Sequence, residues 1–217
     1  MKIVAAKKIL KANDQLAEEN RARFDAACVY CLNLVGSPGC GKTTLLEALF
    51  ARLAGRLAPA VIEGDIAGSI DAERIDALGV PVVQINTDGA CHLDANMIAA
   101  AHRGFDLEAL DLLVIENVGN LVCTAGFDLG EHLRVVVLSV PEGDDKLAKY
   151  PAIFQGSDAL VVTKTDLLPH IRFDVDRVTG DMKRLAPDAE VFRVAALAGD
   201  GIADLADWLA ARCPARA

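Results

Sequence analysis

The fold is decided by one segment, Gly36-Ser37-Pro38-Gly39-Cys40-Gly41-Lys42-Thr43, a glycine-rich stretch that ends in Lys-Thr. Its spacing is G-x-x-x-x-G-K-T, the pattern of a loop that binds phosphate groups. The apolar residues of a predicted strand, 28–35, precede the segment, and a predicted helix, 42–54, follows it. This strand–loop–helix setting is the one that the motif requires, so we interpret the segment as a phosphate-binding loop rather than a chance glycine-rich turn.

The residue types in this loop suit a bound nucleotide. Glycines let the backbone curl until its N–H groups converge on phosphate oxygens, with the positive end of the following helix behind them. Lys42 can reach the β- and γ-phosphates, and the Thr43 hydroxyl is placed to bind Mg²⁺. We expect nucleotide contacts from eight residues of this region: Gly36, Ser37, Gly39, Cys40, Gly41, Lys42, Thr43 and Thr44.

Outward from the loop, short apolar segments alternate with amphipathic ones. This alternation predicts an α/β fold with a mostly parallel sheet, joined by right-handed crossovers and covered by helices on both faces. We expect one P-loop nucleotide-binding domain over residues 28–217, with an N-terminal helical extension over residues 1–27. The expected strands are 28–35, 59–63, 80–85, 112–115, 135–140, 159–163 and 190–194, and the expected helices are 13–27 (opened by Asn13), 42–54, 71–78, 91–102, 144–154, 174–185 and 202–212.

Composition and charge narrow the class of protein. The 217 residues are 53% hydrophobic and 24% charged, which is enough for a buried core and excludes a disordered or fibrous chain. No apolar run reaches the ~18 residues of a membrane span, and the first residues lack the apolar stretch of a secretory signal. We therefore expect a cytoplasmic protein. The formal net charge of −9 disfavours nucleic-acid binding, which depends on neutralising phosphates.

A second motif predicts the base of the nucleotide. Thr163-Lys164-Thr165-Asp166 ends a predicted strand and resembles the N/T-K-x-D guanine motif of GTPases, with Thr163 where Asn is commoner. A carboxylate at Asp166 accepts hydrogen bonds from the guanine N1–H and amine, while the Lys164 stem covers the ring. Adenine would leave this carboxylate unpaired. Later in the chain, Ala195-Ala196 resembles the loop whose backbone N–H contacts guanine O6, with Ala195 in place of Ser.

Acidic residues complete a predicted Mg²⁺ site. Glu116-Asn117-Val118-Gly119 resembles the D-x-x-G switch, with Glu in place of Asp. The Glu116 carboxylate can hold Mg²⁺ through water, and the Gly119 N–H can meet the γ-phosphate. Asp65 is a further candidate ligand; the alternative is a helix-capping role, which we assign to Asp71. We expect the reacting end of the site to consist of Lys42, Thr43, Glu116 and Gly119.

The six cysteines do not indicate a disulfide framework in a cytoplasmic chain. Cys28 and Cys31 have C-x-x-C spacing, but residues three apart on a strand face opposite sides, so we interpret both as packed core residues. Cys91-His92 and Cys123 offer two thiolates and one imidazole, a set that suits Ni²⁺ or Zn²⁺ and leaves a coordination position open. The alternative is ordinary packing, since neighbours at the start of the predicted helix 91–102 diverge in direction.

The remaining histidines and the single tryptophan are less informative. We assign surface roles to His102, His132 and His170, with a secondary metal ligand as the alternative for His102. Trp208 is interpreted as a core anchor of the last helix.

Together these motifs closely resemble the HypB family, the hydrogenase nickel-incorporation GTPases of the SIMIBI class. The resemblance extends over essentially the whole chain, and its most specific parts are C-H-L-D-A (residues 91–95) and E-N-V-G-N-L-V-C (residues 116–123). It also includes Glu63-Gly64-Asp65 and the segment 141–151. The resemblance implies a Ni²⁺ or Zn²⁺ site formed by Cys91, His92 and Cys123, at or near the interface of a GTP-promoted homodimer. It further implies GTP hydrolysis coupled to nickel insertion into [NiFe]-hydrogenase, with other maturation proteins and the hydrogenase large subunit as partners.

Three alternatives remain open from the sequence. A urease-type nickel GTPase has a C-P-H metal motif, whereas Cys91 and His92 are adjacent here. A small-molecule P-loop kinase would make the Cys/His trio accidental, and a preference for GTP over ATP would argue against it. A nickel storage protein is disfavoured because the sequence has no His-rich tract or N-terminal cysteine-rich motif.

Overall fold

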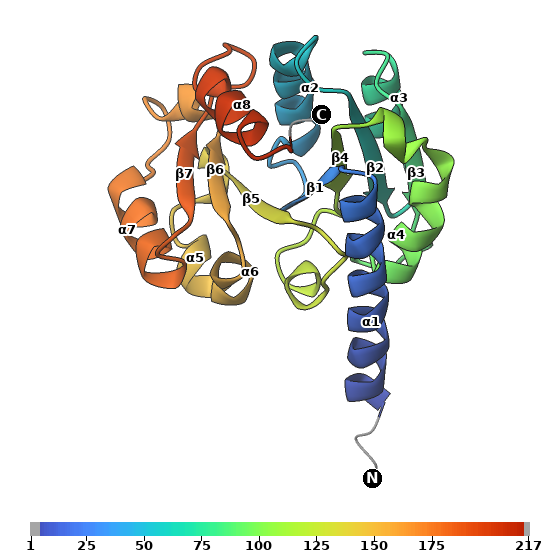
Figure 1. Cartoon of the computed structure of the whole chain (residues 1–217). Coiled ribbons are helices and arrows are strands. Elements are labelled where there is room, and N and C mark those ends of the chain that lie inside the picture. The colour runs from blue at the N-terminus through green and yellow to red at the C-terminus, as the bar shows by residue number, and fades with distance from the viewer. Residues whose placement is uncertain (1–4, 215–217) are drawn as a thin grey trace.

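The centre of the molecule is a seven-stranded, all-parallel sheet (Figure 1). A computed structural model describes the backbone of residues 5–214 and the side chains of residues 11–214; residues 1–4 of the expected extension and 215–217 of the expected domain lie outside it. The strand order is β3-β2-β4-β1-β5-β6-β7. The strands are β1 (Tyr30–Gly36), β2 (Pro59–Asp65), β3 (Val82–Asn86), β4 (Leu112–Glu116), β5 (Leu133–Ser139), β6 (Ala159–Thr163) and β7 (Glu190–Arg193).

Helices cover both faces of this sheet, so the predicted α/β fold is confirmed. Three helices pack on one face: α2 (Lys42–Leu53), α3 (Ile70–Asp76) and α8 (Ile202–Ala210). On the other face, α1 (Ala5–Ala26) and α4 (Ala95–Ala101) cover the half around β2 and β4. The half around β5 and β6 is covered there by α5 (Lys146–Lys149), α6 (Pro151–Gln155) and α7 (Val175–Leu185).

The alternation of side chains along β4 shows why the strands are apolar throughout. Leu112 and Val114 join the core beneath α2, whereas Leu113 and Ile115 join the core beneath α1 and α4. Because both faces of a parallel sheet are buried, consecutive residues of a strand must all be apolar. The next residue, Glu116, is buried on the α2 side, so the first charged group of the strand points toward the phosphate loop.

Two predicted helix starts are wrong. Helix α1 extends from Ala5 to Ala26, so Asn13 lies inside it and is not its N-cap; the end that carries residue 5 projects beyond the body of the molecule (Figure 1). The helix expected over 91–102 begins only at Ala95, because the Asp94 side chain accepts a hydrogen bond from the Met97 N–H and thereby caps it.

The helix expected over 144–154 is also divided. It ends as α5 at Lys149 and restarts as α6 at Pro151. Tyr150 between them has an extended φ of −131°, because a residue that precedes proline avoids the helical conformation. The break sets α5 and α6 as separate short helices over β5 and β6.

Some assignments of single residues also need correction. Cys31 is buried as predicted, but Cys28 is exposed, in a turn before the strand, so its prediction as a core residue is wrong. His102 is only 4% exposed, which corrects its assignment to the surface, whereas His170 is exposed. Trp208 is half-buried and packs edge-on against Phe192, at 5.2 Å between ring centroids.

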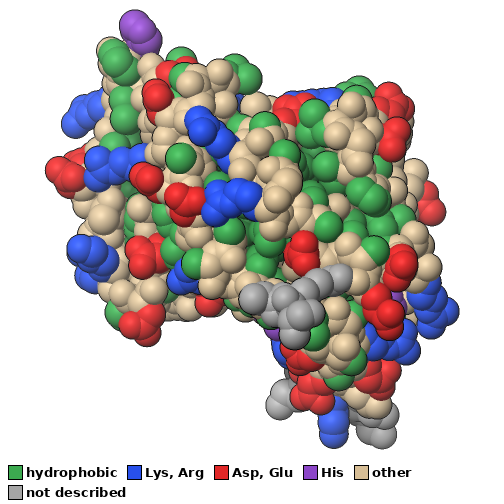
Figure 2. Space-filling view, turned by 45° about the horizontal axis from the view of Figure 1, so that its top comes forward, with side chains coloured by type: hydrophobic (Ala, Val, Ile, Leu, Met, Phe, Trp, Pro, Cys, Tyr) green, Lys and Arg blue, Asp and Glu red, His purple; other side chains and the backbone are tan. Residues whose placement is uncertain are grey.

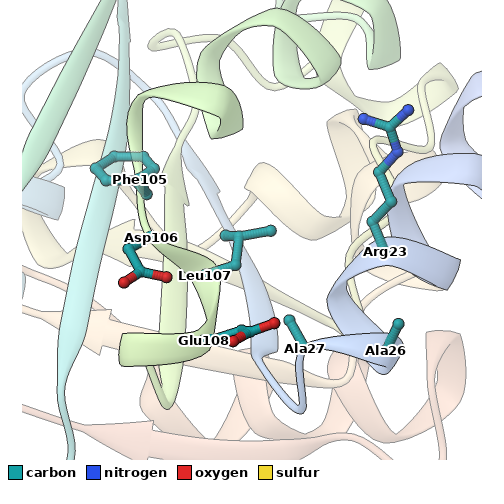
Figure 3. A pocket seen from close by; sticks show the side chains of 7 residues that line it. All are labelled: Arg23, Ala26, Ala27, Phe105, Asp106, Leu107 and Glu108. Atoms are coloured by element: carbon teal, nitrogen blue, oxygen red, sulfur yellow. The ribbon is translucent and has the colours of Figure 1, made fainter.

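Acidic and basic side chains are interspersed over the face in Figure 2. None of the helices in the described part of the chain is long and apolar enough to cross a membrane. A hollow of about 410 Å³ opens between Arg23 near the end of α1, Ala27 just after the helix, and the segment around Phe105 (Figure 3). It lies where the chain enters β1 and β4, at the opposite end of the strands from the phosphate loop.

Candidate nucleotide and metal site

The phosphate loop connects β1 to α2 at the carboxyl ends of the strands, where parallel α/β sheets bind ligands. Its two central glycines, Gly39 and Gly41, have φ values of 71° and 96°, which other residues rarely adopt. The Ser37 carbonyl accepts a hydrogen bond from the Cys40 N–H (3.2 Å). Burial raises the pKa of the Cys40 thiol to about 11, so this cysteine packs inside the loop as a neutral thiol.

The residues of the predicted guanine motif line a cavity of about 310 Å³ beside this loop. The motif also holds the loop in place: Lys164 Nζ donates to the Gly39 carbonyl (2.7 Å), and the Thr163 hydroxyl donates to the Cys40 carbonyl (2.6 Å). Thr163 is therefore used to fix the loop. The lining consists of Gly41, Thr44, Thr163, Lys164, Asp166, Leu167, Ala196 and Leu197.

The two alanines of the second predicted base contact lie in different places relative to this cavity. The Ala195 N–H donates to the Asp200 carbonyl (3.1 Å), and Ala195 is buried. Its neighbour Ala196, not Ala195, lines the cavity. Leu197, which is 94% exposed, stands at the rim, where it can cover one face of a bound base. Thr44 also lines the cavity, and its hydroxyl accepts a hydrogen bond from Arg74 (2.9 Å).

Two buried carboxylates face the start of α2. The Thr43 hydroxyl donates to Glu116 Oε1 (2.8 Å), and Glu63 of β2 lies in register beside Glu116 of β4. Each of the two glutamates has one buried oxygen, Oε2, without a hydrogen-bond partner. Burial is the main cause that raises the pKa of Glu63 to about 8 and of Glu116 to about 7, and the charge of Lys42 opposes it in both. Unsatisfied oxygens beside a hydroxyl fit the ligand set of Mg²⁺.

Both aspartates that the sequence proposed for this region line the same cavity of about 200 Å³ as Lys42 and the two glutamates. Asp65 Oδ1 accepts hydrogen bonds from the backbone N–H groups of Ile66 and Ala67. The assignment of Asp71 as helix cap is wrong, because the N-cap of α3 is Ser69 and Asp71 lies in the first turn, paired with Arg74 (3.0 Å). Glu63 is a residue to which the sequence analysis assigned no role of its own; its signal is a charged side chain near the end of an otherwise apolar strand.

Gly119 lies directly against the phosphate loop. A Cβ atom at this position would come within 2.8 Å of the Pro38 backbone nitrogen, so only glycine allows this approach. Gly119 also lines the cavity of Lys42 and Glu116. The backbone that follows β4 is therefore placed where it can respond to the phosphate end of a nucleotide.

Cys91, His92 and Cys123 come together close to this backbone. One ligand atom from each lies within 4.8 Å of the others, and this is the one such group of His, Cys, Asp or Glu side chains found among the described residues. The Cys91 Sγ–His92 Nδ1 distance is 3.7 Å. Because α4 begins only at Ala95, both residues lie in a bend, where neighbouring side chains can converge. A hydrogen bond with Cys91 raises the pKa of the Cys123 thiol.

Neighbouring groups orient this trio. The His92 ring stacks on Phe127, with 3.9 Å between ring centroids. Asn120 Oδ1 accepts hydrogen bonds from the backbone N–H groups of Val122 (2.7 Å) and Cys123 (2.9 Å), which fixes the turn that carries the Cys123 thiol. Half-buried ligands with fixed neighbours are what a divalent soft-metal site requires.

Asn117, which directly follows β4, is hydrogen-bonded to the segment that carries Cys91 and His92. Its side-chain oxygen accepts hydrogen bonds from the Leu93 N–H (3.2 Å) and the Val118 N–H (2.9 Å). The Leu93 side chain packs over β2 so closely that a Cβ at Gly64 would lie 2.7 Å from it. Asn117 is thus a second residue that sequence analysis missed, because nothing local marks it as a contact of Leu93.

The sheet order and the loop between β1 and α2 define a P-loop nucleotide-binding protein. Residues 30–193 match the family model described as "CobW/HypB/UreG, nucleotide-binding domain". The chain is 53% identical over 202 residues to the hydrogenase maturation factor HypB of Azotobacter vinelandii, covering 93% of this chain and 66% of that protein's length. It is 45% identical to the probable HypB of Methanocaldococcus jannaschii, covering 86% of this chain and 84% of that one.

A solved structure agrees with these relatives. The crystal structure of HypB from Helicobacter pylori in complex with nickel has a TM-score of 0.87 and 40% identity, covering 91% of this chain and 93% of that chain. The chain belongs to the HypB family of P-loop nucleotide-binding proteins. It spans slightly less than two thirds of the length of the Azotobacter vinelandii relative.

Proposed function

We propose that the protein is a cytoplasmic, GTP-hydrolysing metallochaperone that takes part in [NiFe]-hydrogenase maturation. In this role it binds Mg·GTP and Ni²⁺ or Zn²⁺ and uses the nucleotide state to control nickel insertion. The observation that carries the proposal is the Cys91, His92 and Cys123 cluster. It is linked to the phosphate loop through Asn117, which accepts from the Leu93 N–H, and through Gly119, which lies against Pro38 of the loop. The names of the relatives and the nickel in the Helicobacter pylori structure support the choice of cargo.

We assign the base and the phosphates of the nucleotide to two separate cavities. We assign the base to the cavity of Asp166, with the Lys164 stem over the ring and Ala196 at its edge. We assign the phosphates to the loop from Gly36 to Thr43, with Lys42 on the β- and γ-phosphates. Thr43 and Glu116, joined by Asp65 or Glu63, form the set that would hold Mg²⁺, which neutralises phosphate charge when bound. Gly119 completes the reacting end of the site.

The cargo is held by two thiolates and one imidazole. This set suits Ni²⁺ and Zn²⁺, and three protein ligands leave one coordination position for an incoming ligand, which a transferable metal needs. All three ligands are half-buried and Val122 beside Cys123 is 62% exposed, so the site reaches the surface. An exposed site can be shared with a second subunit, in a nucleotide- and metal-dependent homodimer, or offered to another maturation protein or the hydrogenase large subunit.

The link between the two sites is short. Gly119 contacts Pro38 of the phosphate loop, and Asn117 holds Leu93, two residues beyond Cys91. A shift of the residues after Glu116 on GTP binding therefore moves the support of Cys91 and the turn of Cys123 together. Binding linkage requires that the metal alter GTP affinity by the same factor, and a coupling of ~1–3 kcal/mol is typical.

Equilibrium dialysis of Ni²⁺ and Zn²⁺, with GDP and with a non-hydrolysable GTP analogue, tests this proposal while the oligomeric state is followed. We expect one metal per chain, an affinity that differs between the two nucleotides, and a larger assembly with the GTP analogue. Equal metal binding in both nucleotide states would contradict the coupling. A preference for ATP over GTP would contradict the GTPase and favour a P-loop kinase.

A further inference from the structure

Helix α1 packs two almost fully buried amide side chains against the segments next to Cys91, His92 and Cys123. Asn13 is 6% exposed and Asn20 is 1% exposed, although an amide is an unfavourable group to bury without partners. They lie seven residues apart, which places them two helical turns apart on the same face of α1. Ala17, midway between them on this face, is fully buried.

Each of the two asparagines bridges the same two chain segments. Asn13 Oδ1 accepts from the Ala95 N–H (2.9 Å), and its Nδ2 donates to the Asp128 carbonyl (2.8 Å). Asn20 Nδ2 donates to the Ala95 carbonyl (2.9 Å) and to the Leu129 carbonyl (3.1 Å). All four bonds therefore end either on Ala95 or on the turn at 128–129.

These two segments carry the metal site. Ala95 follows His92 by three residues and is the first residue of α4, and Asp128 follows Phe127, the ring on which His92 stacks. Arg21 of α1 strengthens the second attachment, since its Nη2 donates to both carboxylate oxygens of Asp128 (2.8 Å each). The helix thus holds the Cys91-His92 bend and the 123–129 turn in a fixed relation from outside the site.

We infer that α1 is a positioning element for the metal site, with Asn13 and Asn20 as its positioning residues. The two amides set the distance between the segments that carry Cys91, His92 and Cys123, while neither touches the metal ligands. The contact is tight: a Cβ at Gly130 would lie 2.7 Å from the Ala17 carbonyl oxygen and from the Asn20 Cβ, so a shift of α1 moves the turn with it. The inference rests on the proposed metal site and adds a control of that site by the N-terminal helix.

The substitution Asn20→Asp tests this inference, because it removes both donors and places a carboxylate against two carbonyl oxygens. Gln15→Glu is the matched control, an amide-to-carboxylate change on the exposed face of the same helix. Ni²⁺ titration followed by thiolate-to-nickel absorbance, GDP affinity and thermal unfolding are measured for both variants and the wild type. We expect Asn20→Asp to weaken Ni²⁺ binding roughly 10- to 100-fold and to alter the absorbance, with GDP affinity unchanged. Gln15→Glu should match the wild type in Ni²⁺ and GDP binding, with only a small fall in unfolding temperature because its bond to Glu19 becomes an exposed like-charge pair.

Wild-type Ni²⁺ affinity and absorbance in Asn20→Asp, even with a lowered unfolding temperature, would overturn the inference and leave the amides a purely structural role. If Asn20→Asp does not fold, Asn13→Ser is judged by the same two measurements. A wild-type protein that binds no Ni²⁺ would overturn the proposed function itself, and this inference with it. Binding that is lost in Cys123→Ala but normal in both asparagine variants would keep the metal site and reject its control by α1.

Discussion

The phosphate site and the metal site share the residues after β4, yet they are built in different ways. The phosphate loop is one contiguous segment whose curled backbone follows from its own glycines, Gly39 and Gly41, although Thr163 and Lys164 also hold it from outside. The proposed metal site takes its ligands from two segments, and these are packed against residues elsewhere in the fold, including Asn13 of α1 and Phe127. The first site is therefore specified mainly by its own sequence, and the second by tertiary packing. Substitutions that separate the two sites test this difference.

The largest effect is expected for Lys42→Ala. Lys42 is the one basic residue within the loop, so its loss should remove GTP and GDP binding and nearly all hydrolysis. Because the metal site has its own supports, the variant should still bind one Ni²⁺ or Zn²⁺ per chain. Fluorescent-nucleotide titration, phosphate release and metal dialysis measure these three quantities. Wild-type turnover itself should lie well below the ~10 s⁻¹ median of enzymes, because no water-positioning Gln or Arg follows the switch.

If the Lys42→Ala variant still bound nucleotide, another residue would have to supply the positive charge. If the same variant lost metal binding, the two sites would not be independent of each other, which contradicts the comparison.

The converse substitution is Cys123→Ala. It removes one of three ligands, so stoichiometric Ni²⁺ or Zn²⁺ binding should be lost, while GDP affinity stays within about twofold because Cys123 lines neither nucleotide cavity. Cys28→Ala is the matched control, since Cys28 is an exposed thiol outside the cluster. If Cys123 were only a packing residue, the variant would lose roughly 1–2 kcal/mol of stability and bind metal normally.

An intermediate effect is expected for Asp166→Asn. The carboxylate lines the base cavity, and a hydrogen bond to a charged group is worth roughly 1.5–3 kcal/mol, so GTP affinity should fall about 10- to 150-fold. Xanthosine triphosphate, which presents a carbonyl where guanine has an amine, should bind relatively better. Competition titrations with GTP, xanthosine triphosphate and ATP measure this change in base preference. Unchanged GTP affinity would show that another segment reads the base.

The same contrast explains what could be predicted from the sequence. The alternation of apolar strands and helices is enough to predict the α/β sheet, and the loop from Gly36 to Thr43 is predicted from its spacing alone. Asn13 was misassigned as a helix cap because asparagine is common at such positions, whereas here its amide is buried against Ala95. Glu63 and Asn117 were missed because their roles depend on strand register and on a contact with Leu93. Local motifs fix local sites; the supports of the metal site require the packed fold.

The smallest effect is expected on the pH dependence of stability, at His102, which packs where α4 ends against α1. His102 lies edge-on to Phe24 (5.7 Å) and near the Arg23 guanidinium; burial, with the charges of Arg23 and Arg103, lowers its pKa from the ordinary 6.5. A histidine whose folded pKa is depressed contributes stability that is present above its unfolded pKa and is lost as the pH falls below it. Urea unfolding of the wild type should therefore show a loss of stability below about pH 6.5 that His102→Gln reduces. His170→Gln, at an exposed histidine, should follow the wild-type profile. Parallel pH profiles for the wild type and His102→Gln would show that this imidazole binds its proton equally well in the folded and unfolded states, so that acid does not destabilise the protein through it.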